Sequence, residues 1–293
     1  MKMVMLMNKL KPYLMIAPAC IIFLLFSIYP IISMIDLSFY DWDFISPTKT
    51  FVALDNYRAL FNDPLFYQTL KNTFVYMVLT VSIGLILALL LALFLNKSSK
   101  VNKFMQSIIF SPYIISLASV SFLWMWLMNK DYGLLNYILS IFGIDAVDWL
   151  GNPNVALYSL VGISVWKTVG YNTIIVLSGL QSIPQYLYEA ASLDQASKWQ
   201  VFKKITFPML SPTLFFLAIT NIISSFKVFE TIQIITKGGP QNSTNTLVYS
   251  LYEYGFKYYK IGYASTIGVV LLVIIAILTI IYFKTLSKKV HYQ

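Results

Sequence analysis

The side chains that carry most enzyme chemistry are nearly absent from this sequence. It holds one cysteine, Cys20, and one histidine, His291, which are too few for a disulfide framework, a zinc site or a histidine-based catalytic triad. It also has no GxxxxGK[ST] phosphate loop, so nucleotide hydrolysis by that route is excluded. We therefore expect no catalytic residue, no metal ligands and no cofactor bound by this chain.

Polar side chains inside long apolar stretches are the remaining candidates for chemistry. A charged or amide group in hydrocarbon is costly, so it usually faces a cavity or a partner. The candidates for a hydrophilic solute path are Trp166, Lys167, Tyr171, Asn172, Asn221 and Ser225. Amides and hydroxyls suit the hydroxyl groups of sugars, aromatic rings suit stacking, and the ammonium of Lys167 suits a phosphorylated polyol.

Less specific interpretations of the same residues stay open. Polar groups also hold transmembrane helices together, and a lysine can extend its ammonium to the membrane surface. Lys227 and Glu230 stand three residues apart, which predicts an ion pair on one helical face near the outer boundary of the membrane.

The polar segment at about residues 181–207 connects two apolar stretches. It is the longest such connection on the same side of the membrane as the N-terminus. Pro184 is placed to begin a helix, and a second helix over 198–207 leads into the next apolar stretch. We expect the first helix to expose small side chains at Ala190 and Ala191. Such a face would let the surface of another protein approach closely.

Composition places all of these residues in a membrane protein. The chain has 293 residues, of which 58% are hydrophobic and 11% charged, whereas soluble domains carry roughly a quarter charged residues. Each helical crossing needs about 20 mostly apolar residues. Six stretches qualify, at about 12–35, 70–95, 104–128, 155–180, 208–229 and 262–283. The first is too long for a signal peptide and lacks a cleavage site, so we expect a retained anchor.

The basic residues predict the orientation of these spans. With the N-terminus inside, twelve of the 21 basic residues fall on inner segments, where the only acids are Glu189 and Asp194. The other ten of the twelve acids fall on outer segments. Both termini are therefore expected to be cytoplasmic, and the net charge of +9 indicates membrane topology rather than binding to nucleic acid.

The inner segment around Glu189 resembles the cytoplasmic signature of ABC importer permeases, EAA-x3-G-x9-I-x-L-P. The matching residues are Glu189, Ala190, Ala191, Gln195, Ile205, Phe207 and Pro208, at the same spacing. Phe207 stands where the signature has Leu, which is a conservative change. Gln195 stands where it has Gly, and a side chain at a left-handed helix end is disfavoured by roughly 1 kcal/mol.

The resemblance extends over nearly the whole chain. The stretches FVALDNYRALFNDPLFYQTLKNTF, YEAASLD and TKGGPQNSTNTLVYSLYEYGF look like the carbohydrate-uptake branch of this family. That branch includes maltose, multiple-sugar and glycerol-3-phosphate permeases. It implies an all-α polytopic membrane protein with six transmembrane helices, a cytoplasmic coupling helix and a single permease domain over residues 1–293.

The resemblance also implies a function and a set of partners. The expected function is a permease subunit in the cell membrane that moves a sugar or related polyol, glycerol-3-phosphate among them, into the cell. The implied partners are a second homologous permease, two cytoplasmic ATPase subunits that bind ATP and Mg, an extracytoplasmic solute-binding protein and membrane lipid. The residues implied in coupling to the ATPase are Glu189, Ala190, Ala191, Asp194 and Gln195.

Two other classes of protein are weighed against this expectation. A secondary transporter driven by an ion gradient would also need several spans. Proton relays in membranes usually need Asp, Glu or His, and no acidic residue lies in the middle of any expected span. A membrane-embedded enzyme is less well supported still, since the spans offer no histidine, acid or metal cluster.

Overall fold

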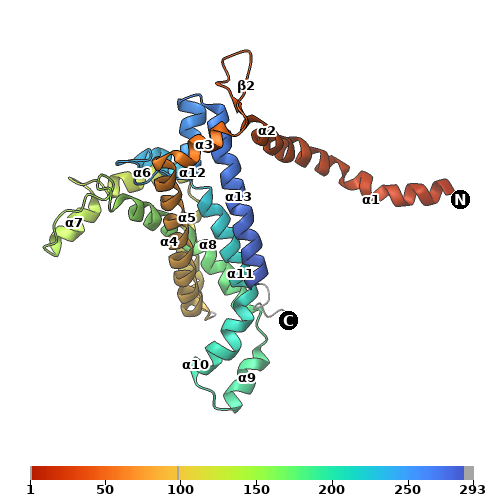
Figure 1. The fold of residues 1–293 in the computed structure, drawn as a ribbon. Helices are drawn as coiled ribbons and strands as arrows, with labels where there is room; N and C mark the ends of the chain where they lie inside the picture. The colour runs from red at the N-terminus through yellow and green to blue at the C-terminus, as the bar shows by residue number, and fades with distance from the viewer. Residues whose placement is uncertain (1, 98, 287–293) are drawn as a thin grey trace. The chain divides into compact units, whose positions relative to one another are not determined.

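The computed structural model describes residues 2–97 and 99–286 and is built almost entirely of helices (Figure 1). It divides into two compact units. One comprises Met1–Asp63 and Leu251–Leu272, and the other comprises Pro64–Ser250 and Val273–Gln293. The all-α class expected from the sequence is confirmed. Lys288, Lys289 and His291 lie outside the described residues, and the cytoplasmic location of both termini stays a prediction.

The first unit joins the N-terminal helices to the start of the last helix. Its elements are α1 (Lys2–Phe23), the π-helical η1 (Leu24–Ile28), α2 (Tyr29–Leu37), β1 (Tyr40–Asp41), β2 (Thr50–Phe51), α3 (Asp55–Asn62), η4 (Glu253–Lys257) and the first part of α13 (Ile261–Leu286). The two strands pair antiparallel, with Tyr40 opposite Phe51. The backbone N–H of Ile261 donates to the carbonyl of Trp42 at 2.9 Å, which joins this pair of strands to the start of α13.

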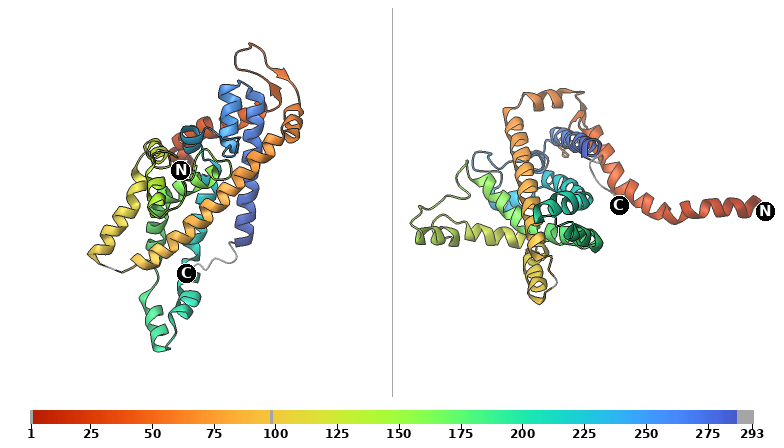
Figure 2. Two further views of the ribbon diagram at one scale, coloured as in Figure 1. Left: turned by 90° about the vertical axis from the view of Figure 1, so that its left-hand side faces the viewer. Right: turned by 90° about the horizontal axis from the view of Figure 1, so that it is seen from below.

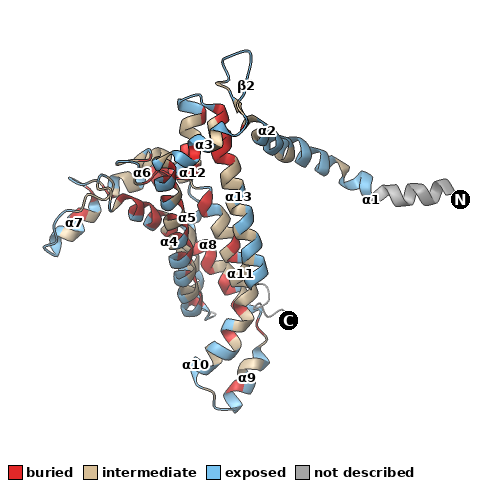
Figure 3. Cartoon of the chain, in the orientation of Figure 1, coloured by how far each residue is buried: buried red, intermediate tan, exposed pale blue. Residues whose placement is uncertain are grey.

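The second unit is a bundle of long helices around α8. Its elements are α4 (Pro64–Leu95), α5 (Lys100–Ile114), α6 (Leu117–Leu127), α7 (Leu134–Ile141), α8 (Ala156–Gln181), α9 (Gln185–Leu193), α10 (Lys198–Val201), η2 (Phe202–Thr206), α11 (Phe207–Phe226), η3 (Ile232–Thr236), most of α12 (Leu247–Tyr252) and the end of α13. The central helix α8 packs against α4, α5 and α11 (Figure 2). Buried residues are numerous on α4, α8 and α11, whereas α5 has none (Figure 3).

Five helices in the described part of the chain are long and apolar enough to cross a membrane. They are Tyr13–Leu37, Pro64–Leu95, Ala156–Gln181, Lys198–Phe226 and Ile261–Thr285. The pair α5 and α6, bent by 98°, makes a sixth if it counts as one span. The expected span at 104–128 is therefore a broken helix pair rather than one straight helix.

The break between α5 and α6 has a local cause. Ile115 and Ser116 both adopt extended backbone, with ψ of 142°, which ends the helical hydrogen bonding of α5. The hydroxyl of Ser116 then accepts the backbone N–H of Ser119 at 3.2 Å and caps the start of α6. The last carbonyl groups of α5 are left without helical partners.

Gly170 lets α5 lie directly against α8. A Cβ atom at this position would overlap the backbone carbonyl of Ile109 on α5. Farther along α8, Gly162 faces open space instead, with no atom within 4 Å of a Cβ built there. The small residue at position 170 therefore allows the close approach of the two helices.

Candidate functional site: a polar cavity beside α8

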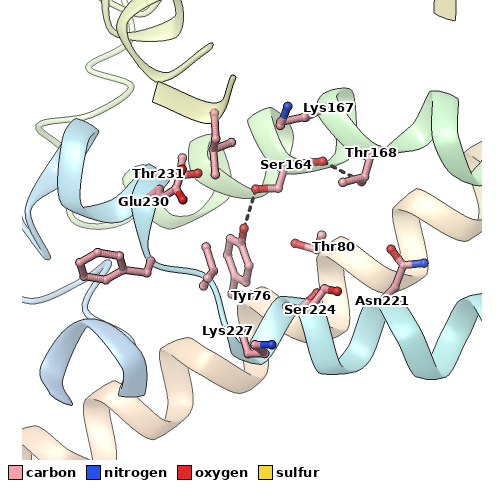
Figure 4. Close-up of a pocket in the computed structure, with 14 residues that line it drawn as sticks. Tyr76, Thr80, Ser164, Lys167, Thr168, Asn221, Ser224, Lys227, Glu230 and Thr231 are labelled. Atoms are coloured by element: carbon pink, nitrogen blue, oxygen red, sulfur yellow. Dashed lines mark hydrogen bonds between the residues drawn. The ribbon is translucent and has the colours of Figure 1, made fainter. Parts of the chain in front are cut away.

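A polar cavity of about 290 Å³ lies in the second unit between α4, α8 and the end of α11 (Figure 4). Its lining consists of Tyr76 and Thr80 from α4, Leu117 from α6, Ser164, Lys167 and Thr168 from α8, Asn221, Ser224 and Ser225 from α11, and residues 227–231. Most of these side chains end in a hydroxyl or an amide. The cavity can therefore exchange hydrogen bonds with a solute that carries several hydroxyl groups.

Three of the six residues expected on a solute path line this cavity, namely Lys167, Asn221 and Ser225. A fourth, Asn172, is only 1% exposed and lies behind the lining. Its side-chain amide donates to the amide oxygen of Asn221 at 3.4 Å, and Asn221 donates back to Asn172 at 3.1 Å. Asn172 thus holds a lining residue in place and joins α8 to α11.

The two aromatic candidates lie in ring contacts outside the lining. Trp166 meets Trp124 edge to face, with ring centroids 5.4 Å apart. Tyr171 stacks on Tyr113 with centroids 4.6 Å apart and an interplanar angle of 16°. Both contacts join α8 to the α5–α6 pair, so the structure places these rings between helices.

Lys167 lines the cavity with its stem, while its ammonium is engaged by the end of α5. The Nζ atom donates to the carbonyl oxygens of Pro112 at 3.2 Å, Tyr113 at 3.3 Å and Ile115 at 2.6 Å. An ammonium has three N–H donors, so these contacts use all of them. In Figure 4 the ammonium points away from Tyr76 and Thr80. Lys167 thereby satisfies the carbonyl groups that the break after α5 leaves free.

The sequence candidates do not include the hydroxyl groups that α4 contributes to the lining, nor Ser164 and Thr168 of α8. Tyr76 and Ser164 share a hydrogen bond of 2.5 Å across the cavity, and the hydroxyl of Thr168 donates to the carbonyl of Ser164 at 2.8 Å. The signal that could have found them is periodic. Thr69, Thr73, Tyr76 and Thr80 recur every three or four residues, which puts them on one face of α4.

The ion pair expected between Lys227 and Glu230 is wrong. The helix α11 ends at Phe226, and Lys227 is its C-cap, so the two residues do not share a helical face. Among the ion pairs of residues 2–97 and 99–286, none joins these two side chains. Both line the cavity instead, as separate charged groups (Figure 4).

The segment that carries the EAA signature folds as the expected helical hairpin. Pro184 precedes α9, and Ser197 begins α10 with a capping box. The hydroxyl of Ser197 accepts the backbone N–H of Gln200, and the side-chain oxygen of Gln200 accepts the backbone N–H of Ser197. Gln195 ends α9 with φ of +53°, in the left-handed region. The N–H of Ala196 donates to the carbonyl of Ala191 at 2.9 Å, so the turn forms without glycine.

The exposed face of this hairpin differs in part from expectation. Glu189, Ala190, Asp194 and Gln195 are exposed. Ala191, however, is only 8% exposed, because it lies on the side of α9 that turns inward. The largest exposed apolar side chains of the hairpin are Tyr186, Leu193 and Trp199, and Leu193 is 86% exposed. None of these three belongs to the EAA signature.

The hairpin is packed onto the helical bundle at its base. Leu187, Tyr188 and Ile205 contact the buried apolar cluster formed by α4, α8 and α11. The hydroxyl groups of Tyr188 and Thr206 also lie 3.3 Å apart, which links α9 to η2. The hairpin is therefore joined by direct contacts to the helices that surround the cavity.

The chain matches one protein family over most of its length. Residues 72–292 match the family described as binding-protein-dependent transport system inner membrane component. The matched region includes all of the cavity lining and the whole hairpin with the EAA signature.

Individual proteins match over nearly the entire chain. The sn-glycerol-3-phosphate transport system permease protein UgpA of Agrobacterium fabrum is 36% identical over 100% of both chains. The trehalose/maltose transport system permease protein MalF of Thermococcus litoralis is 37% identical, covering 93% of this chain and 92% of its own. Among solved structures, a bacterial alginate ABC transporter in complex with alginate pentasaccharide-bound periplasmic protein contains a chain with 25% identity. Its TM-score is 0.84, with 98% of this chain and 99% of that chain covered.

Proposed function

Because the chain belongs to the binding-protein-dependent inner-membrane components of ABC importers, we propose that its polar cavity forms part of the transmembrane path of a carbohydrate. In this proposal the chain works beside a second permease, two ATPase subunits and an extracytoplasmic solute-binding protein. The cavity supplies reversible hydrogen bonds to the solute, and the energy comes from ATP hydrolysis by the partners. The chain itself performs no covalent chemistry.

The observation that carries the proposal is the hydroxyl and amide lining between three membrane-length helices. Water is absent from the bilayer core, so polar side chains there need partners. Ser224 is exposed on the lining. A solute rich in hydroxyl groups would give such a group a hydrogen-bond partner. The relative named for trehalose and maltose agrees with a solute of this kind.

The hairpin of α9 and α10 is the proposed contact with the ATPase subunits. Leu193 and Trp199 give it an exposed apolar surface, and Glu189 and Asp194 add charge. Exposed apolar side chains rimmed by polar ones are typical of protein–protein contacts. The packing of Leu187 and Tyr188 onto the helical bundle supports transmission of ATPase closure to the cavity.

This role requires the hairpin of α9 and α10 to face the cytoplasm. The same orientation puts both termini in the cytoplasm. The excess of lysine on the inner segments supports that orientation. Cys20 is the only cysteine in the chain, so a Cys20→Ser background allows single cysteines to be placed at will. A membrane-impermeant maleimide should label Ser46→Cys from outside intact cells and should label Ser192→Cys only after the membrane is opened. The reverse pattern would contradict the orientation.

The solute path is tested by filling the cavity. Ser224→Leu places a bulky apolar side chain on the exposed lining without removing a packed group, so ATP-dependent uptake by the assembled importer should fall at least tenfold. Ser178→Leu makes the same change at an exposed position of α8 outside the lining and should leave uptake within twofold. Equal uptake by both variants, with ATPase subunits still bound, would contradict a path through this cavity.

A further inference from the structure

The charged groups around the cavity are few and differ in what they can still bind. Lys167 and Lys227 are the lysines of the lining, and Glu230 is its acidic residue. All three N–H donors of Lys167 are occupied by carbonyl oxygens at the end of α5. A helix C-terminus carries about half a negative charge, so α5 also offsets part of the lysine's charge.

Glu230 adds a carboxylate to the same lining. Among the ion pairs of the described residues, none involves Glu230 or Lys227. The ammonium of Lys227 is therefore the one cationic group of the described lining that has neither a carboxylate within ion-pair distance nor its donors filled by carbonyl groups.

A phosphate or carboxylate passing through this cavity would meet one available ammonium, that of Lys227, opposed by the carboxylate of Glu230. Tight binding of such anions relies on several charge-assisted donors that converge on one group. Lys167 would first have to release the carbonyl groups that close the break after α5. Glu230 would repel the anion, since like charges disfavour each other more strongly in a medium less polar than water. The hydroxyl and amide groups that remain bind uncharged hydroxyl groups equally well as donors or acceptors.

We infer that the path through this chain is selective for uncharged sugars and polyols against phosphorylated or carboxylated ones, and that Glu230 determines this specificity. The inference rests on the proposed function, because it concerns the same cavity. It separates this chain from relatives whose names specify sn-glycerol-3-phosphate or alginate, both of which are anionic. It agrees with the relative named for trehalose and maltose, which are uncharged.

The test is competitive uptake by the complete importer in proteoliposomes. The vesicles are given ATP inside and an equimolar external mixture of neutral mono-, di- and trisaccharides and polyols, with glycerol-3-phosphate, glucuronate and alginate oligosaccharides. The contents are then identified by mass spectrometry. We expect the wild-type importer to accumulate uncharged solutes at least tenfold over anionic ones. Glu230→Gln should raise the anionic share at least threefold.

Glu253→Gln is the control, since Glu253 pairs with Lys257 at 3.0 Å in the first unit and does not line the cavity. It should leave the ratio of anionic to uncharged solutes unchanged. Preferential accumulation of the anionic solutes by wild type would overturn the inference, as would an unchanged ratio in Glu230→Gln. A complete lack of ATP-dependent accumulation would instead contradict the proposed function.

Discussion

Lys167 shows how the role of a single residue depends on its contacts. Its position inside a membrane-length helix suggested a cation for a phosphorylated solute. The structure shows the ammonium bonded to the carbonyl groups of Pro112, Tyr113 and Ile115, where it closes the break between α5 and α6. The open alternative, that polar groups in these spans hold helices together, describes the observed contacts of Lys167 and Asn172.

Lys167→Met keeps much of the side-chain volume and removes the three charge-assisted hydrogen bonds. Such bonds contribute about 1.5–3 kcal/mol to stability, and their loss leaves the carbonyl groups at the end of α5 without this partner. We expect the unfolding free energy of the purified chain in detergent to fall by about 2 kcal/mol. Lys227→Met is the matched control and should change it little. Equal losses in the two variants would show that the contacts of Lys167 with α5 contribute no stability.

Gln195 is a second residue to consider, because its backbone conformation determines how its side chain affects the stability of the turn after α9. At φ of +53° a side chain is strained by roughly 1–2 kcal/mol, and glycine is not. Gln195→Gly should therefore protect the amide protons of α9 more strongly against hydrogen exchange, by about 1 kcal/mol, with ATPase binding retained. Weaker protection of α9 would mean that the glutamine side chain itself stabilises the turn.

At the scale of elements, the contact between α5 and α8 depends on a missing side chain. Gly170→Ala would force the two helices apart, because the new Cβ overlaps the carbonyl of Ile109. Overpacking of this kind costs about 1–3 kcal/mol. Gly162→Ala makes the same change on the same helix in open space, and alanine is the better helix former by about 1 kcal/mol. In thermal denaturation, the melting temperature of Gly170→Ala should be lower than that of wild type, and that of Gly162→Ala should be equal or higher. The opposite order would contradict this packing.

The hairpin of α9 and α10 is the second element whose proposed role can be tested by mutation. Leu193→Asp places a charge at its most exposed apolar position, and loss of one central apolar contact costs about 1–2 kcal/mol of binding. Co-purification of the ATPase subunits should therefore fall roughly five- to thirtyfold. Leu54→Asp changes a leucine that is also exposed but lies outside the hairpin, and it should leave ATPase binding intact. Similar losses in both variants would argue against docking through Leu193.

At the scale of the whole molecule, the sequence predicts what depends on local composition. The long apolar stretches and the helical hairpin around Glu189 are present at nearly the expected residues, because each is encoded by a continuous segment. The expected third span at 104–128 is one continuous stretch in the sequence, whereas the structure breaks it at Ile115 and Ser116.

The candidate site was predicted less completely, because its geometry depends on residues far apart in the chain. The carbonyl groups that bind Lys167 lie 52 to 55 residues away, and Asn221 lies 49 residues from Asn172. No local pattern shows that Trp166 and Tyr171 turn toward other rings. The hydroxyl groups on α4 were the part of the site that helical periodicity alone could have revealed.

Solute uptake with and without the ATPase subunits tests the proposed function most directly. Proteoliposomes are prepared with the chain, its partner permease and its binding protein, and are supplied with internal ATP or with a proton or sodium gradient. Accumulation should occur only when the ATPase subunits and hydrolysable ATP are both present, and it should be lost with a nonhydrolysable analogue. Gradient-driven accumulation by the permeases without any ATPase would contradict the proposed function and would identify the chain as a secondary transporter.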